Sequence, residues 1–333
     1  MSLSVLEVVI IIILAWIYDF FNGMNDAANA IATTVSTRAL TPRQAILLAQ
    51  IFNVIGAFMT TAVARTIGKG IVRPEAIDQV VVVAALIGAS SWSALCTFAG
   101  IPISITHALV AGIMGGTIFA KGVGVLQWAG IQKVIIAMFL SPLAGFLAGF
   151  LMMVSILWLF RRMLPSKINR WFRYGQILSA SFVAFTHGSN DAQNAMGIIT
   201  ASLVIGGFLD SFHVPFWVIL GSAGFMGLGT AVGGWKVIRT MGMKMVKLKP
   251  VHGFSAECST SLVVLIATLL GAPISTTHVI STSIMGVGAT RRLSAVRWGV
   301  ARHIVLTWIF TFPGAALIAG IMYVLISLVA SFV

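Results

Sequence analysis

Long apolar stretches alternate with short polar segments along the whole chain. A helix needs about 20 apolar residues to cross the hydrocarbon core of a bilayer, and most of the stretches approach or exceed that length. The pattern predicts ten helices, five in each half, at residues 3–22, 43–64, 77–98, 104–120, 131–160, 175–199, 212–234, 254–271, 275–290 and 303–332. We therefore expect an all-α polytopic membrane protein.

The composition excludes a soluble protein. Of the 333 residues, 59% are hydrophobic and 9% are charged, whereas about a quarter of the residues of a soluble protein are charged. The first apolar stretch lacks the small-residue cleavage site of a secretory signal, so we expect it to remain in the bilayer. The predicted location is the cell membrane, with multiple passes.

Two short strings each occur twice, in the same order. Asn-Asp-Ala-x-Asn-Ala occupies residues 25–30 and 190–195, and Pro-Ile-Ser-x-Thr-His occupies 102–107 and 273–278. The copies are offset by 165 residues for the first string and by 171 for the second. This near-constant offset indicates a duplicated unit. We predict one transmembrane repeat at 1–160, a basic cytoplasmic linker at 161–174 and a second repeat at 175–333.

The distribution of basic residues predicts the orientation. An odd number of helices in each half makes the second copy enter the membrane from the opposite face, so the repeats are inverted. Of the 21 lysines and arginines, 16 lie in the odd-numbered connections, which include the linker, and five lie in the even-numbered ones. Because basic residues are retained on the cytoplasmic side, the N-terminus is predicted outside. The net charge of +13 then reflects topology and gives no reason to expect nucleic-acid binding.

Inverted repeats with interrupted helices indicate a secondary transporter whose site lies near the membrane midplane. The Asn-Asp strings carry helix-breaking residues at Asn22-Gly23 and His187-Gly188. We expect each string to break or reorient its helix inside the protein, at the pseudo-symmetry axis.

The Asn-Asp strings also contain the best candidate cation ligands. Asp26 and Asn29 are three residues apart, as are Asp191 and Asn194, so each pair can share a helical face. A carboxylate and an amide oxygen together suit a hard cation. An ionised carboxylate at the bilayer centre costs about 2.5–3.5 kcal/mol, which makes an intramembrane aspartate a functional candidate. The alternative is that both aspartates only cap helices.

The Pro-Ile-Ser-x-Thr-His strings place hydroxyl groups at predicted helix N-termini, where proline in the first turn leaves backbone N–H groups unpaired. Such N-termini attract anions. The predicted substrate ligands are Ser104, Thr106, Ser275, Thr276 and Thr277, together with Asn25 and Asn190. The alternative is that the hydroxyls bond to their own helices.

Lysine and arginine are absent from the middle of every predicted span. A divalent anion would therefore face two aspartates without a fixed cationic partner, and cotransported cations would have to balance it. This reasoning favours coupling of anion entry to a cation gradient. The same absence permits a transporter of cations alone, so the sequence physics leaves both alternatives open.

Four further polar residues are weaker candidates. Glu257 begins an apolar helix and has no acidic counterpart in the first half, so it is either a proton or cation site or an interfacial carboxylate. Asn53 is a supporting donor or, more simply, an interhelical hydrogen-bonding residue. His107 and His278 are either proton carriers or packed neutral side chains.

The duplicated strings resemble the two signatures of the inorganic phosphate transporter (Pit) family. The first signature matches residues 23–30 and 188–195, and the second matches both Pro-Ile-Ser-x-Thr-His strings. The resemblance covers nearly the whole chain and implies a secondary carrier that moves phosphate with sodium or protons, or as a metal-phosphate complex. It implies cation sites at Asp26, Asn29, Asp191 and Asn194, and phosphate binding by the second signature. One departure is Ile105, where the second copy has Thr276.

Several alternatives remain at this stage. Another oxyanion such as sulfate, a divalent cation or a metal-phosphate complex could be the substrate, and the coupling ion could be sodium or a proton. A hydrolase is disfavoured because the chain lacks Gly-x-Ser-x-Gly and His-Glu-x-x-His patterns, and no cofactor is expected. Glycine-rich helices and a large apolar surface are compatible with a homodimer.

Overall fold

The computed structural model describes residues 5–70 and 78–331, which form an all-helical protein. The first half contains α1 (Val5–Ser36), α2 (Pro42–Ala57), α3 (Ala62–Gly70), α4 (Gln79–Ala99), α5 (Ile105–Lys121) and α6 (Trp128–Leu159). The second half contains α7 (Pro165–Asp191), α8 (Gln193–Ile205), α9 (Phe216–Val232), α10 (Trp235–Arg239), α11 (Pro250–Leu269), α12 (Thr276–Ala289) and α13 (Trp298–Ala330). The predicted ends at residues 3, 77 and 332 lie outside the described residues.

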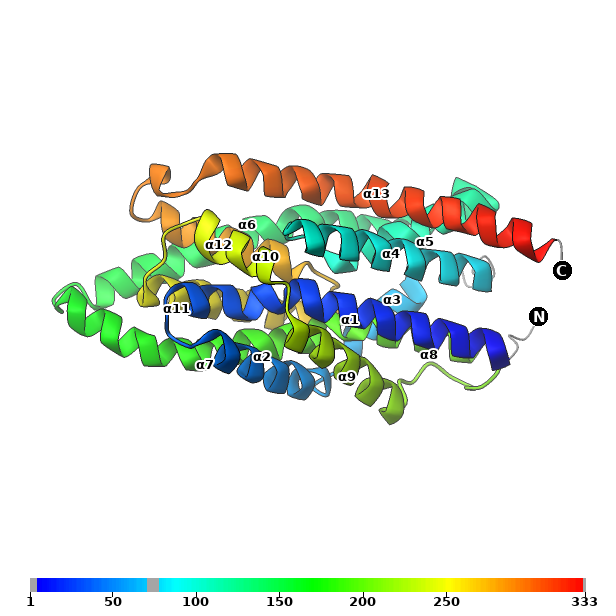
Figure 1. The fold of residues 1–333 in the computed structure, drawn as a ribbon, viewed down its shortest axis with the longest axis horizontal. Coiled ribbons are helices and arrows are strands. Elements are labelled where there is room, and N and C mark those ends of the chain that lie inside the picture. The colour runs from blue at the N-terminus through cyan, green and yellow to red at the C-terminus, as the bar shows by residue number, and fades with distance from the viewer. Residues whose placement is uncertain (1–4, 71–77, 332–333) are drawn as a thin grey trace.

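The two halves have the same order of elements and opposite directions. Each contains a long first helix, a bent helix pair, a helical hairpin and a long last helix. α1 starts at the end of the molecule that carries both termini, whereas α7 starts at the other end (Figure 1). The last helix of each half packs against the hairpin of the other, α13 on α5 and α6 on α12. The predicted fold of two inverted repeats is confirmed.

The hairpins α4–α5 and α11–α12 turn back inside the protein. Asn25, deep within α1, donates a hydrogen bond to the carbonyl of Ile101 at the first tip (3.5 Å). Asn190 of α7 donates in the same way to Ala272 at the second tip (3.5 Å). Because the tips lie at the depth of these asparagines, the predicted helices 77–98 and 104–120, like 254–271 and 275–290, are arms of re-entrant hairpins. The tips carry no lysine or arginine, so the charge asymmetry is unaffected.

The expectation that the Asn-Asp strings interrupt their helices is wrong for the first copy. α1 continues unbroken through this string, and the second copy has only a turn at Ala192, between α7 and α8. A methyl group on Gly23 would lie 1.9 Å from the Met226 carbonyl oxygen of α9, and one on Gly188 2.0 Å from the Asn53 carbonyl oxygen of α2. These glycines therefore permit close helix packing, which is typical of membrane proteins.

The real interruptions lie elsewhere. α2 and α3 meet at an angle of 74°, and α9 meets α10 and its π-helical continuation at 63°. The predicted single helix 43–64 is thus a bent pair, whereas the predicted helix 212–234 corresponds to α9 alone, because α10 begins beyond its end. Within residues 5–70 and 78–331, five helices, α1, α4, α6, α11 and α13, are long and apolar enough to cross a membrane, and each bent pair could add one broken span.

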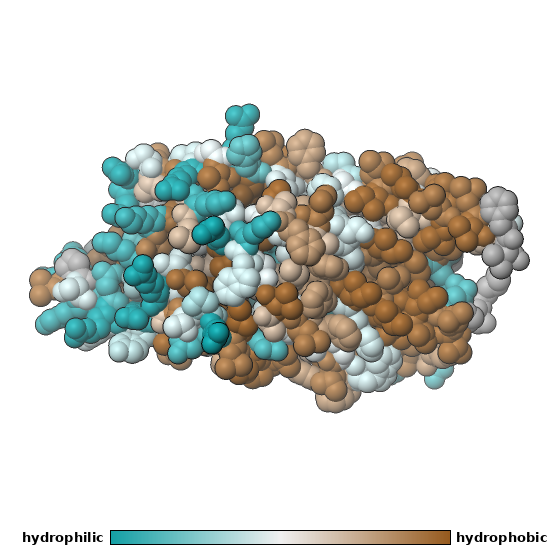
Figure 2. Space-filling view, in the orientation of Figure 1, coloured by the Kyte–Doolittle hydropathy of each residue, from teal (hydrophilic) through white to brown (hydrophobic). Residues whose placement is uncertain are grey.

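The surface separates a hydrophilic end from a broad apolar zone. Figure 2 shows hydrophilic residues gathered at the end where α6 passes into α7, with apolar residues over most of the remaining visible surface. Exposed basic residues at the hydrophilic end include Arg38, Arg161, Arg162, Arg170 and Arg173. α7 already begins at Pro165, so most of the predicted linker 161–174 is helical.

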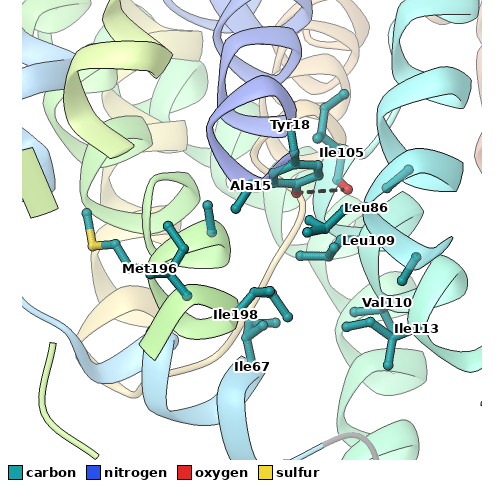
Figure 3. Close-up of a cluster of buried hydrophobic side chains, with 14 of the residues drawn as sticks. Ala15, Tyr18, Ile67, Leu86, Ile105, Leu109, Val110, Ile113, Met196 and Ile198 are labelled. Carbon is teal, nitrogen blue, oxygen red and sulfur yellow. Dashed lines mark hydrogen bonds between the residues drawn. The ribbon is translucent and has the colours of Figure 1, made fainter. Parts of the chain in front are cut away.

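A cluster of buried apolar side chains packs around the N-terminal half of α1. Side chains from α1, α3, α4, α5 and α8 meet there, and the Tyr18 hydroxyl donates to the Ile105 carbonyl (3.2 Å), as Figure 3 shows. This contact fixes the first turn of α5 against α1. The packing thereby positions the start of α5 beside the candidate site.

Candidate ion and substrate site

The two Asn-Asp strings bring their aspartates together. Asp26 of α1 and Asp191, the last residue of α7, lie on either side of His187. His187 Nε2 is 3.0 Å from a carboxylate oxygen of Asp191 and 3.6 Å from one of Asp26. Ligand atoms of these three residues lie within 4.8 Å of one another. The cluster is closed to both sides of the protein, because Asp26 and Asp191 are only 2% and 1% exposed.

The first half-site combines residues of both repeats. Thr277, in the first turn of α12, donates a hydrogen bond to the Asp26 carboxylate (2.9 Å). It also accepts one from the amide of Asn29, one turn along α1 (2.9 Å). The start of the second hairpin's return arm is thereby held against the Asn-Asp string of the first repeat.

The second half-site repeats the arrangement of the first, with the two repeats exchanged. Thr106, in the first turn of α5, lies 3.5 Å from a carboxylate oxygen of Asp191. It accepts a hydrogen bond from the amide of Asn194 (2.8 Å). Each half-site therefore takes its carboxylate and amide from one repeat and its threonine from the other.

Thr276 breaks this symmetry. Its hydroxyl donates to Asp191 (2.6 Å) and accepts from Asn29 (3.2 Å), so it joins the two half-sites. The equivalent position, Ile105, is 1% exposed and packs in the apolar cluster. The first repeat consequently has no hydroxyl that could form the same bridge.

Asn25 and Asn190 hold the hairpins to the long helices. The amide of Asn25 donates to Thr97 of α4, and that of Asn190 to Thr268 of α11, at 2.8 Å in both cases. Each amide nitrogen also donates to a carbonyl at its own hairpin tip, at 3.5 Å in both repeats. Their nitrogens are thus engaged within their own repeats.

The amide oxygens in the two strings have a different environment. Among the described residues, no hydrogen-bond partner contacts the buried side-chain oxygens of Asn25, Asn29, Asn190 and Asn194. A buried oxygen without a donor is costly, and carboxylate and amide oxygens are the ligands that hard cations prefer. This donor set fits cations beside the two aspartates.

Ser104 and Ser275 cap α5 and α12. Each hydroxyl oxygen accepts from the backbone N–H three residues on, at 3.2 Å for His107 and 3.1 Å for His278. The alternative in which these hydroxyls bond to their own helix therefore describes both serines. The caps fix the two helix N-termini that approach Asp191 through Thr106 and Thr276.

The weaker candidates lie around this centre. The Asn53 amide oxygen accepts a hydrogen bond from His187 Nδ1 (2.9 Å) and its amide nitrogen donates to Thr230 (3.1 Å), so Asn53 is an interhelical residue that also orients His187. The rings of His107 and His278 pack together, with centroids 5.1 Å apart. Among the described residues, the ring nitrogens of both histidines lack a hydrogen-bond partner of good geometry, so neither ring is bonded to a half-site.

Glu257 lies apart from the aspartates, two turns inside α11. It is fully buried and accepts hydrogen bonds from Thr33 (2.5 Å), Gln176 (3.0 Å) and Ser179. Because α11 begins at Pro250 rather than at residue 254, Glu257 is not an interfacial carboxylate at a helix end.

The sequence reasoning assigned no role to His187 or Tyr18. His187 occupies the position of Asn22 in the repeated string and precedes Asp191 by four residues, a spacing that places both on one helical face. Tyr18 accepts a hydrogen bond from Asn194 (3.4 Å) as well as donating to Ile105. The helical spacing could have identified His187, whereas nothing in the string identifies Tyr18.

Comparison with known proteins gives the same duplication. The profile of the Phosphate transporter family (PHO4) matches residues 22–167 and again residues 160–319. The chain belongs to this phosphate transporter family. Family membership confirms the resemblance seen in the two signatures, and it assigns the protein to transport rather than to enzymatic catalysis.

Individual members of the family cover almost the same length. The chain is 42% identical over 332 residues to a "Probable low-affinity inorganic phosphate transporter" of Bacillus subtilis (strain 168), covering 99% of this chain and 100% of the relative. It is 44% identical to the protein of the same name from Rhizobium meliloti (strain 1021), covering 96% of both chains. A solved structure described as "The sodium-dependent phosphate transporter" superposes with a TM-score of 0.90 at 30% identity, covering 97% of this chain and 99% of the other.

Proposed function

We propose that this protein imports inorganic phosphate by symport with cations, and that sodium is the main coupling ion. The observation that carries the proposal is the convergence of two hairpin helix N-termini and two Asn-Asp strings on one closed cluster. The likeness to a sodium-dependent phosphate transporter over nearly the whole chain supports phosphate and sodium.

Phosphate is assigned to the space between the starts of α5 and α12. Both helices direct unpaired backbone N–H groups and the positive ends of their dipoles toward the cluster. Thr106, Thr276 and Thr277 add hydroxyl groups at the same place. Ser104 and Ser275 hold these N-termini and can still donate their hydroxyl hydrogens to the anion.

The coupling cations are assigned to the two half-sites. Asp26 with Asn29, and Asp191 with Asn194, supply carboxylate and amide oxygens, and Asn25 and Asn190 supply further amide oxygens from the same strings. Cations bound there reduce the repulsion between the aspartates and a phosphate anion. Phosphate therefore binds well only after the cations, which couples the two gradients.

Transport follows from the inverted repeats. Each half-site joins a string of one repeat to a hairpin of the other, so movement of one repeat against the other opens the cluster to one side at a time. The hydrophilic end with the exposed arginines is assigned to the cytoplasm, which places both termini outside. The occluded cluster corresponds to the intermediate between the two open states.

A second candidate substrate is a metal-phosphate complex. The Asp26–His187–Asp191 cluster offers two carboxylates and one imidazole to a divalent metal, with ligand atoms within 4.8 Å of one another. In that case the metal would replace sodium between the aspartates. Phosphate uptake would then require a divalent metal and proceed without sodium.

The test is uptake of isotopic phosphate by liposomes that contain the purified protein. Inward sodium and proton gradients are imposed separately, with and without a metal chelator, and Asp26→Asn is measured alongside. The proposal predicts sodium-stimulated uptake that chelation leaves intact and that the variant loses. Competition by unlabelled sulfate equal to that by phosphate, or no phosphate uptake under either gradient, would refute it.

A further inference from the structure

α1 carries a second aspartate, Asp19, that the proposed half-sites do not use. Asp19 is fully buried, and neither of its carboxylate oxygens has a hydrogen-bond partner of good geometry among the described residues. It has no acidic counterpart, because the equivalent position in the second repeat is Ala184. An ionised carboxylate in this position would be costly unless a positive charge accompanies it.

The surroundings of Asp19 supply further oxygens. The side-chain oxygen of Asn22, one turn along the same helix, is buried and unpartnered within the described chain. The hydroxyl of Ser222 on α9 lies beside the Asp19 carboxylate and likewise forms no hydrogen bond of good geometry there. Both Asn22 and Ser222 are 0% exposed. A carboxylate with a hydroxyl oxygen beside it and an unpartnered amide oxygen one helical turn away offers oxygen ligands of the kind that a small cation prefers.

Within the described part of the chain, no lysine or arginine is among the charged groups that act on Asp19, including those of α2, α7 and α10. The helices α4, α8 and α9, which pack on α1, contain no lysine or arginine. The titratable groups that face the carboxylate are Tyr18 of the same helix and Asp191 at the end of α7. The negative charge of Asp191 disfavours a second bare carboxylate at Asp19, and the neutral Tyr18 offers no positive charge.

Glu257 provides an informative contrast. Asp19, Asp26 and Thr33 are spaced by seven residues, so they lie on one face of α1, about 10 Å apart along the axis. Thr33 is one of the three donors that satisfy Glu257 at one end of this row. At the other end, toward the chain termini, only the Ser222 hydroxyl lies beside Asp19 among the described residues, and it makes no hydrogen bond of good geometry. The protein thus stabilises one outlying carboxylate itself and leaves the other for a ligand.

We propose that Asp19, with Asn22 and Ser222, forms a third coupling-cation site that takes sodium or a proton and lies about two helical turns from Asp26. The inference rests on the proposed cation–phosphate symport. Occupancy of this site adds one cation to each transport cycle. It also removes a negative charge that faces Asp191 and thereby favours loading of the central cluster.

The test measures the limiting accumulation of phosphate in liposomes with the membrane potential clamped. A tenfold inward gradient is imposed of sodium alone or of protons alone, for wild type and Asp19→Asn. Because each coupled cation multiplies the limit by the gradient, losing one cation lowers accumulation about tenfold. A lower phosphate accumulation limit in the sodium-gradient experiment identifies sodium as the cation, and a lower limit in the proton-gradient experiment identifies the proton. Ser222→Ala should weaken the dependence on that cation, and Asp210→Asn, an exposed loop change, should alter nothing.

The outcomes separate this inference from the function on which it rests. Absence of phosphate accumulation by wild type would refute the symport itself. Wild-type accumulation with an unchanged limit in Asp19→Asn, in both arms, would overturn the third site alone. Phosphate–phosphate exchange at equal concentrations should persist in the variant. Loss of exchange by folded Asp19→Asn, with Asp19→Glu equally inactive, would place Asp19 in the phosphate site and also overturn the proposal.

Discussion

The two repeats share a scaffold and differ in the groups that they place on it. The hairpin tethers of Asn25 and Asn190 have equal lengths of 2.8 Å, and the carbonyls of the two tips are contacted at 3.5 Å in both. By contrast, Thr276 bridges the half-sites where Ile105 cannot. The symmetric contacts therefore account for the scaffold that the two half-sites share, whereas Thr276 links the half-sites in a way that the first repeat cannot reproduce.

The largest expected effect comes from neutralising either central aspartate. Asp26→Asn and Asp191→Asn each remove a buried charge that accepts a threonine hydrogen bond and is proposed to bind a cation, a loss of about 2–5 kcal/mol. Phosphate uptake should fall by about 30-fold or more in both variants. Asp210→Asn is the matched control in an exposed loop. Retention of uptake by one aspartate variant would show that the half-sites are not equivalent.

Removing the bridging hydroxyl tests the asymmetry. Thr276→Val keeps the shape of the side chain and removes its hydrogen bond to the Asp191 carboxylate, which is worth about 1.5–3 kcal/mol. The apparent affinity for phosphate or sodium in liposome uptake should weaken by about tenfold or more. Thr276→Ser, which retains the hydroxyl, should stay near wild type. Equal loss in both variants would attribute the effect to packing.

The glycines test the shared scaffold. A methyl group on Gly23 or Gly188 would lie about 2 Å from a backbone oxygen of the facing helix, so Gly23→Ala and Gly188→Ala must separate those helices. Overpacking of this kind costs about 1–3 kcal/mol. Both variants should lower the thermal unfolding temperature in detergent. Gly224→Ala has no atom within 4 Å of the new methyl group and should leave that temperature unchanged.

The smallest effect is expected from the hairpin tethers. Thr97→Val and Thr268→Val each remove the acceptor of one neutral hydrogen bond, worth about 1 kcal/mol. Uptake should decrease about fivefold and to the same extent in both variants. Thr117→Val, whose hydroxyl bonds only within α5 among the described contacts, is the control. A marked difference between the two tether variants would break the symmetry of the scaffold.

The sequence predicted the inverted repeats and the residues of both half-sites, because duplicated strings and apolar length are visible along one chain. It did not predict the re-entrant hairpins. α4 and α5 are about as long and apolar as membrane-spanning helices. The hairpin becomes evident from the hydrogen bond that joins Asn25, in the interior of α1, to the hairpin tip. Gly23 was interpreted as a helix breaker because sequence gives no information on the neighbouring helix that requires it.

The sequence also could not predict which residues of one repeat contact which residues of the other. Thr277 and Asp26 are 251 residues apart, and no periodicity connects them. The repeat pattern does not indicate His187, because this residue stands where the first copy has Asn22.

We propose that sodium and phosphate bind one cluster built from both repeats and cross the membrane together. Simultaneous uptake of isotopic sodium and isotopic phosphate into liposomes, with the proton gradient collapsed, tests it most directly. The account predicts that each ion enters only when the other is present, at a fixed ratio, and that Asp26→Asn and Asp191→Asn abolish both fluxes. Phosphate entry at an unchanged rate without sodium would contradict it.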